Sequence, residues 1–361
     1  MGKTYAWHPG SRALARVDGI AVALLPDESI SSWLVRCALQ SGCDPLVYTG
    51  AVWPKWRPWT LDIDRGFDIQ KRVALSRKTG VDADVIANAF LQGIETYPAA
   101  KPRAQGLWSW IVALGLRNRR RATGSQFCPA CLRSDKVPYF RIQWRYALEL
   151  VCIQHGCYLQ DSCPNCNSPV SPHLLKAERR SIAICHICGV GLAQRNIRKA
   201  DATQLTFAKR AREAVLQGVV QSNWFTVVRS TLKLIRRSYI KKDLKAALDY
   251  FHIQLFIALP NNTGLTFELM RLDQRIALLQ QAAPIILGVS AYLNGEEVTN
   301  SPNAIVIPLI KALSSDLSST TRIGPIARVT SSAPRSSKRV LRAYNLLLRR
   351  NRLAQSQHHD R

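Results

Sequence analysis

The chain has 361 residues, 47% of them hydrophobic, which is enough for two or three domains with buried cores. Its 50 lysines and arginines exceed its 24 aspartates and glutamates and give a net charge of +26, which favours nucleic acid as a partner. We find no apolar run of about 18 residues and no signal-peptide pattern, which argues against a membrane protein. We therefore expect a cytoplasmic, reducing location, where cysteines bind metal rather than form disulfides.

The first 120 residues predict an irregular arm at 1–23 followed by helices. The stretch 24–40 has one apolar face, and Pro26, Asp27 and Glu28 suit a helix start. The stretch 52–60 holds three tryptophans among prolines and cations. It fits a loop folded onto the core better than a base-stacking platform, although aromatics between cations also suit single strands.

Residues 68–93 have the layout of two helices joined by a turn at Thr79-Gly80. The second helix starts with Asp82 and Asp84, whereas a helix that reads the major groove usually presents donors and cations there. We therefore expect a helix-turn-helix-like unit with a structural or protein-contact role ahead of base reading.

An apolar stretch at 108–116 is followed directly by a basic run. Such a run can be a solvated face or the end of a helix, but beside a metal module it favours phosphate contact. The residues of this candidate nucleic-acid contact are Arg117, Arg119, Arg120 and Arg121.

Eight candidate metal ligands occur in four pairs, each pair with two residues between its members. Twenty residues separate the first two pairs and eighteen separate the last two, which suits two tetrahedral zinc sites with four soft ligands each. The first predicted site is Cys128, Cys131, Cys152 and His155. The second is Cys163, Cys166, Cys185 and Cys188.

Other residues of this stretch have weaker assignments. Cys157 is read as a spare thiol that could compete as a ligand, and His173 and His186 are not expected to bind metal. Four cations between the first two pairs lie among aromatic residues and could position phosphates: Arg133, Lys136, Arg141 and Arg145. Of these, Arg141 and Arg145 are the candidate phosphate contacts. A zinc ion with four protein ligands has no position for water or substrate, so we expect structural sites without catalysis.

From residue 201 onward the pattern is helical, with predicted helices at 205–219, 227–248 and 267–279 and a weaker one at 301–313. The second of these has a basic face, whose candidate nucleic-acid contacts are Arg236, Arg237, Lys241 and Lys242. Together these patterns predict a mainly α-helical, multi-domain protein. The domains are an N-terminal arm (1–23), a helix-turn-helix-like domain (24–121), a tandem zinc-finger or zinc-ribbon module (122–198), a helical domain (199–313), and a Ser-rich linker with a basic tail (314–361).

Several motifs resemble the TniQ/TnsD family, and the resemblance covers about residues 24–190. They are the LPDESISSWL segment at 25–34, the first knuckle at 127–132, PYFRIQWR at 138–145, CIQHG at 152–156 and CPNC at 163–166. One departure is Asn167, which stands where a glycine often follows the third knuckle.

This resemblance implies a transposon target-selection protein that is not an enzyme. Such proteins bind attachment-site DNA or dock on a CRISPR Cascade complex with its guide RNA, recruit an AAA+ regulator and the transposase, and can form homodimers. A stand-alone, zinc-dependent, sequence-specific DNA-binding regulator is the alternative. A nuclease or recombinase is disfavoured, because two-metal chemistry needs clustered carboxylates. The densest group near the front of the chain, Asp62, Asp64 and Asp68, falls in an expected loop or helix start.

Overall fold

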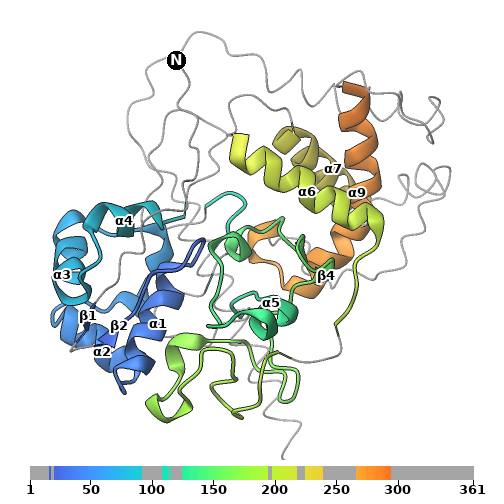
Figure 1. The fold of residues 1–361 in the computed structure, drawn as a ribbon. Helices are drawn as coiled ribbons and strands as arrows, with labels where there is room; N and C mark the ends of the chain where they lie inside the picture. Colours follow the sequence, from blue (N-terminus) through green and yellow to red (C-terminus); the bar gives the residue numbers. More distant parts are fainter. Residues whose placement is uncertain are drawn as a thin grey trace, which may run out of the picture. The chain divides into compact units, whose positions relative to one another are not determined.

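The computed structural model describes residues 16–17, 20–91, 108–112, 114, 124–193, 197–217, 224–238 and 266–293. This part of the chain is mostly helical with little sheet, as predicted (Figure 1). The sheet consists of two short antiparallel hairpins, β1 (Arg16–Val17) with β2 (Ile20–Ala21) and β3 (Val151–Cys152) with β4 (Cys157–Tyr158). Most of the predicted arm, the helix at 301–313 and the linker and tail at 314–361 lie outside the described residues.

Helix α1 (Ile30–Gln40) begins six residues later than the sequence pattern predicted. The predicted start is wrong because residues 25–28 form a turn, in which the Glu28 amide bonds to the Leu25 carbonyl and Asp27 has a φ of 55°. Ser29 is the N-cap, and its hydroxyl accepts a hydrogen bond from the Ser32 amide at 3.2 Å. Almost the whole helix is buried.

The polar residues of the 25–34 motif join α1 to the rest of the protein. The Ser32 hydroxyl donates to Glu28 Oε1 at 2.8 Å and accepts from the Phe140 amide at 2.9 Å. Glu28 Oε2 also accepts from Arg36 at 2.9 Å, and the Ser31 amide and hydroxyl both donate to Asp64. The motif therefore forms a hydrogen-bonded junction between α1, Asp64 and Phe140. The sequence alone does not indicate these partners of the serines.

We expect Ser32→Ala to lower the free energy of unfolding by about 1–3 kcal/mol, because it leaves the Phe140 amide and one Glu28 oxygen without their buried partner. Urea titration followed by circular dichroism measures this loss. Ser41→Ala at the C-cap of the same helix is the matched control, because the Ser41 hydroxyl has no hydrogen-bond partner among the described residues. A control effect as large as that of Ser32→Ala would contradict the junction.

The tryptophan-rich segment at 52–60 packs onto the core. It follows helix α2 (Pro45–Val52), ends in the 3₁₀ turn η1 (Pro58–Thr60) and is followed by the turn η2 (Ile63–Arg65). Trp53 and Trp59 are buried. Their indole N–H groups donate to the Lys71 carbonyl and to the Thr49 hydroxyl. The core interpretation of these two tryptophans therefore holds.

Helices α3 (Ile69–Thr79) and α4 (Ala83–Asn88) form the predicted pair. Asp68 and Asp82 cap their N-termini, and Gly80 adopts a φ of 73° in the turn between them. The second helix has only six residues, and Asp82 and Asp84 are exposed at its start. Asp82 thus caps the N-terminus of α4, and the carboxylates at this helix start face solvent.

The middle of the chain consists of short elements. They are α5 (Pro129–Ser134), η3 (Ile142–Arg145), the β3–β4 hairpin, η4 (Pro172–Leu174) and η5 (Ala177–Arg179). Its buried cysteines belong to the same hydrophobic core as α1 and the buried tryptophans. The N-terminal helices and this middle segment therefore share one core.

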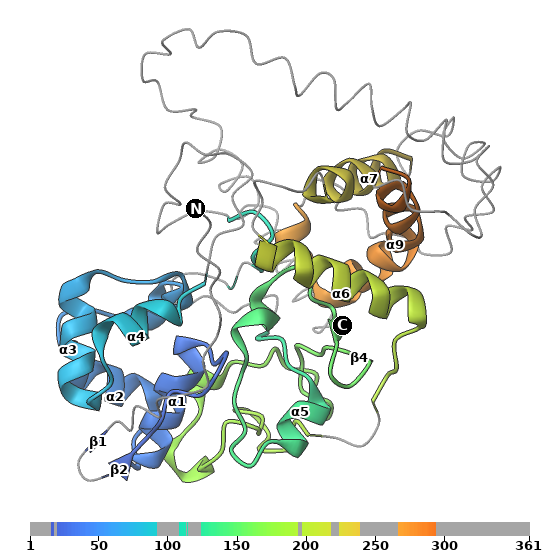
Figure 2. The same ribbon diagram turned by 45° about the horizontal axis from the view of Figure 1, so that its top comes forward.

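A second core lies among α6 (Ala202–Gln217), α7 (Trp224–Ser238), the turn η7 (Phe267–Leu269) and α9 (Leu272–Leu293). Helix α9 packs against both α6 and α7 (Figure 2). The prediction of one helix at 267–279 is wrong at both ends, because a 3₁₀ turn comes first and α9 continues through Pro284 to Leu293. The end of the helix predicted at 227–248 falls outside the described residues.

The buried Arg275 of α9 attaches this helical part to the middle segment. Its guanidinium donates to the Ala147 carbonyl at 2.7 Å and to Gln126 Oε1 at 2.6 Å. Gln126 also donates to the Trp144 carbonyl and lies two residues before Cys128. The segment that begins the first metal-ligand pair is thus held by the last described helix.

Candidate metal centres

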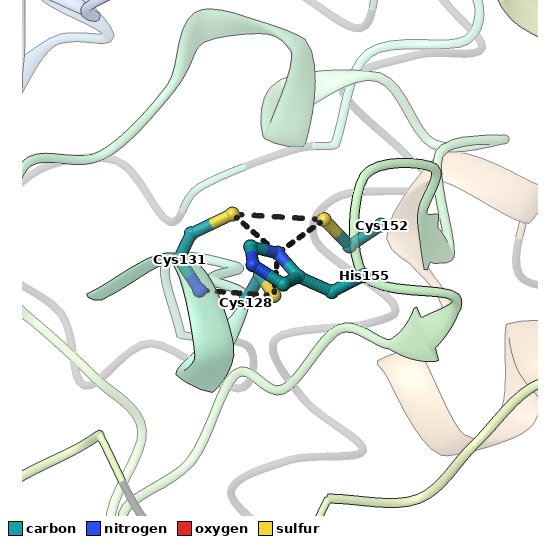
Figure 3. A group of neighbouring side chains, drawn as sticks. All are labelled: Cys128, Cys131, Cys152 and His155. Atoms are coloured by element: carbon teal, nitrogen blue, oxygen red, sulfur yellow. Dashed lines mark hydrogen bonds between the residues drawn. The ribbon is translucent and has the colours of Figure 1, made fainter. Parts of the chain in front are cut away.

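Four of the predicted ligands meet in a first cluster (Figure 3). Cys128 is the N-cap of α5 and Cys131 lies in its first turn, whereas Cys152 ends β3 and His155 lies in the β3–β4 turn. His155 Nδ1 lies 3.2 Å from Cys131 Sγ, 3.5 Å from Cys152 Sγ and 3.7 Å from Cys128 Sγ. Cys131 Sγ and Cys152 Sγ are 3.6 Å apart.

These separations match the edges of a tetrahedron around one metal ion. With zinc–sulfur bonds of about 2.3 Å and zinc–nitrogen bonds of about 2.0 Å, the ligand atoms of a regular tetrahedron are roughly 3.5–3.8 Å apart. A disulfide would require about 2.05 Å between sulfurs. The first cluster can therefore hold a metal ion, and no two of its three cysteines form a disulfide.

The remaining four predicted ligands form a second cluster, Cys163, Cys166, Cys185 and Cys188. Cys163 Sγ lies 3.5 Å from Cys188 Sγ, and Cys166 Sγ lies 3.7 Å from Cys185 Sγ. Cys163 and Cys185 are buried, whereas Cys166 is exposed. The second cluster thus has the same dimensions as the first and is more open to solvent.

The residue after a ligand pair adopts a left-handed conformation in three of the four cases. Gly156 has a φ of 58° and Gly189 a φ of 75°, and Asn167 adopts 52° at the corresponding place. Asparagine tolerates this conformation better than other non-glycine residues. The departure from the family pattern at Asn167 is therefore compatible with the same turn.

Cys157 lies beside the first cluster without belonging to it. Its sulfur is buried and 3.5 Å from Cys128 Sγ, but it does not lie within reach of all four ligand atoms. His173 stacks on Trp59 at a ring-centroid distance of 5.3 Å, and His186 is in neither cluster. These positions agree with the interpretation of all three as non-ligands.

We expect Cys157→Ala to retain the full metal content, about two ions per chain, because both sets of four ligands stay complete. Elemental analysis of the purified variant beside the wild-type protein gives this ratio. Thermal unfolding checks that the lost thiol costs only packing, on the order of 1 kcal/mol. The loss of one ion would instead show that Cys157 replaces a neighbour as ligand.

The predicted nucleic-acid contacts are placed only in part. Arg117, Arg119, Arg120, Arg121, Lys241 and Lys242 lie outside the described residues, and so do the side chains of Arg236 and Arg237 at the end of α7. Arg141 is half-buried, pairs with Asp135 at 2.8 Å and stacks over Tyr139. Its guanidinium is therefore engaged within the protein.

Arg145 requires a correction, because its side chain is buried and bound to two carboxylates. Its guanidinium donates to Asp62 at 2.6 Å and to Asp64 at 2.5 Å. Although burial alone would lower its pKa, these carboxylates raise the pKa of Arg145 above its usual range. The expectation that Arg145 contacts a phosphate does not fit this position.

The same network contains Asp62 and Asp64, two of the three clustered carboxylates noted in the sequence. Asp62 binds Arg65 as well as Arg145, and burial raises the pKa of Asp64. Neither acid belongs to a metal-ligand cluster in the described part of the chain. Sequence reasoning noticed these acids but not their partner, because Arg145 lies more than eighty positions further along the chain.

A comparison with family models matches the part of the chain that contains the N-terminal helices and the first cluster. The TniQ model matches residues 20–159, which include α1, the α3–α4 pair and all four ligands of the first cluster. The chain carries a TniQ domain. The second cluster and the helices α6, α7 and α9 lie beyond the match. A comparison with curated proteins returned no match.

The TniQ domain implies a function associated with transposition, as the motifs suggested. Within the described residues, no helix has the length and apolarity needed to cross a bilayer. The two clusters have the donor sets and the spacing to hold metal ions.

Proposed function

We propose that the protein is a target-selection adaptor of a transposon without catalytic activity of its own. It binds target DNA, a CRISPR Cascade complex with guide RNA, or both, and it recruits the AAA+ regulator and the transposase. The TniQ domain at 20–159 carries this proposal. The net charge of +26 supports a nucleic-acid partner.

We further propose that both clusters bind Zn²⁺ as structural centres. Thiolate and imidazole are the donors that zinc prefers, and four protein ligands leave no open position for a reacting water. The first centre joins α5 to the β3–β4 hairpin, and the second joins the segments around Cys163 and Cys185. Each metal ion would thus join two chain segments and would not take part in a reaction.

A transposition assay tests the adaptor role. Insertion at the target should require the transposase, the AAA+ regulator and this protein together, and it should recover when purified protein is added back. The protein alone with a DNA duplex and Mg²⁺ should cleave no strand. Insertion at the same target and frequency without the protein would overturn the proposal. Omitting the Cascade complex separates direct DNA reading from RNA-guided recruitment.

A further inference from the structure

The first metal centre is flanked by exposed cations from two segments that are far apart in the sequence. Arg133 and Lys136 are exposed on α5 and just after it, and α5 supplies two of the ligands. Arg198 and Lys199 are exposed on the segment 197–200, which leads into α6. Arg133 and Lys136 are among the cations that the sequence places between the first two ligand pairs, whereas Arg198 and Lys199 were not suggested by any sequence pattern.

The segment 197–200 is fastened to the hairpin that carries His155. The Tyr158 amide donates to the Arg198 carbonyl at 3.0 Å, and the Ala200 amide donates to the Gly156 carbonyl at 3.0 Å. Lys199 Nζ donates to the His155 carbonyl at 3.1 Å. Figures 1 and 2 both show this yellow-green segment passing β4 on its way to α6.

The metal ligands fix this hairpin against α5. His155 Nδ1 lies 3.2 Å from Cys131 Sγ, so the turn to which Lys199 is bonded and the helix that bears Arg133 meet at this centre. The two pairs of cations therefore lie on segments that meet at one centre, although more than sixty positions of sequence separate the pairs.

Three of the four cations are not neutralised by an acid in the described part of the chain. Of these cations, Lys136, Arg198 and Lys199 form no ion pair with any residue that the structure describes. Asp135 is engaged by Arg141, and Asp201 accepts a hydrogen bond from the Gln204 amide at 2.8 Å. The Arg198 guanidinium lies 4.5 Å from the centre of the Tyr158 ring, which orients an exposed cation.

We propose that Arg133, Lys136, Arg198 and Lys199 form a metal-centred basic surface that binds the phosphate backbone of duplex DNA. The inference rests on the proposed function and names the part of the chain that touches the DNA. Cations and polar donors position a protein on the backbone, and Gln154 is an exposed donor beside them. A lipid surface fits less well, because among the exposed large apolar side chains of the described residues only Val137 lies in these segments.

The test measures binding of the full chain to a fluorescent mixed-sequence duplex at several salt concentrations. The double variant Lys136→Gln and Lys199→Gln should weaken binding roughly 10- to 60-fold at about 0.1 M salt. It should also reduce the slope of log K against log salt by about 2, because each lost phosphate contact removes about 0.9. Glutamine keeps a donor in place of each ammonium, so folding and metal content should match the wild type.

A matched control removes two exposed cations from the tryptophan-rich loop, Lys55→Gln and Arg57→Gln. Equal losses in both double variants would overturn the surface, because binding would then follow total charge alone. An unchanged slope in Lys136→Gln and Lys199→Gln would overturn it while leaving DNA binding by the chain intact. Absence of duplex binding by the wild type would also remove the DNA part of the proposed function. Vesicles of anionic lipid that bind in place of the duplex would identify the wrong partner class.

Discussion

Replacing Cys131 by serine should release the metal from the first centre and unfold the TniQ domain. Cys131 Sγ contacts two other ligand atoms of the cluster and is completely buried in the shared core. A structural zinc contributes an apparent free energy of about 10–16 kcal/mol, which equals or exceeds the whole stability of a typical domain, about 5–15 kcal/mol. Metal content should fall from about two ions per chain to about one or fewer, and the cooperative unfolding transition should disappear.

Two variants make this result specific. Cys43→Ser changes a half-buried thiol outside both clusters, so metal content and unfolding should stay at wild-type values. Cys166→Ser changes an exposed ligand of the second centre. It should release one ion and leave the ion of the first centre bound. A Cys131→Ser protein that keeps both ions and the wild-type unfolding temperature would show that the first centre is not a structural metal site.

The two clusters of candidate metal ligands were predictable because their signal is local. A pair such as Cys163 and Cys166 must place two sulfurs on one side of an ion, and this constraint is visible in a four-residue window. The α3–α4 pair was predictable for the same reason, since Asp68, Gly80 and Asp82 act on their own helix ends. The start of α1 was missed because acids near a proline suit both a helix start and the turn that precedes one.

The role of the basic residues was not predictable, because the partners of a cation are set by tertiary structure. Arg141 and Arg145 are four positions apart and looked alike in the sequence. One lies half-buried against Asp135 and the other is buried between Asp62 and Asp64. Lys199 was not among the candidates, since only the folded hairpin places it beside a predicted metal ligand. Buried cations such as Arg145 stabilise the fold, whereas exposed cations remain accessible to a phosphate.

Three buried contacts connect the middle segment to its neighbours on both sides. Ser32 and Arg145 join it to the N-terminal helices, and Arg275 joins it to α9. Trp110 adds a further link, since its amide donates to Glu268 at 2.9 Å while its own φ is 63°. Loss of the first metal centre should therefore disturb both cores, which explains why a single ligand variant is expected to have so large an effect.

The second large effect is expected for Arg145→Met, which should lower the free energy of unfolding by about 3–5 kcal/mol at pH 8. Methionine fills much of the volume of arginine, so the loss of stability measures mainly the effect of removing the positive charge. Asp64 would stay buried with its carboxylate bonded only to the Ser31 amide and hydroxyl. Arg65 would still neutralise Asp62. Urea unfolding of the variant and the wild type at each pH gives the difference.

This deficit should shrink as the pH falls from 8 to 5. Burial already raises the pKa of Asp64 in the native protein, and the pKa rises further without the Arg145 guanidinium. A carboxyl group whose folded pKa exceeds its unfolded value, about 3.9, favours folding at low pH and loses that contribution as pH rises through the folded pKa. The metal ligands are the same in the variant and the wild type. Their contribution to the pH dependence of stability therefore cancels when the two proteins are compared at each pH.

Arg271→Met is the control, because Arg271 is 60% exposed and its pair with Asp273 is solvated. Its effect should stay within about 0.5 kcal/mol at both pH values. If Arg145→Met were as stable as the wild type and instead lost affinity for duplex DNA, Arg145 would be a phosphate contact after all. The opposite result, a large pH-dependent loss of stability, would assign Arg145 to the fold and leave DNA contact to exposed cations such as Lys136 and Lys199.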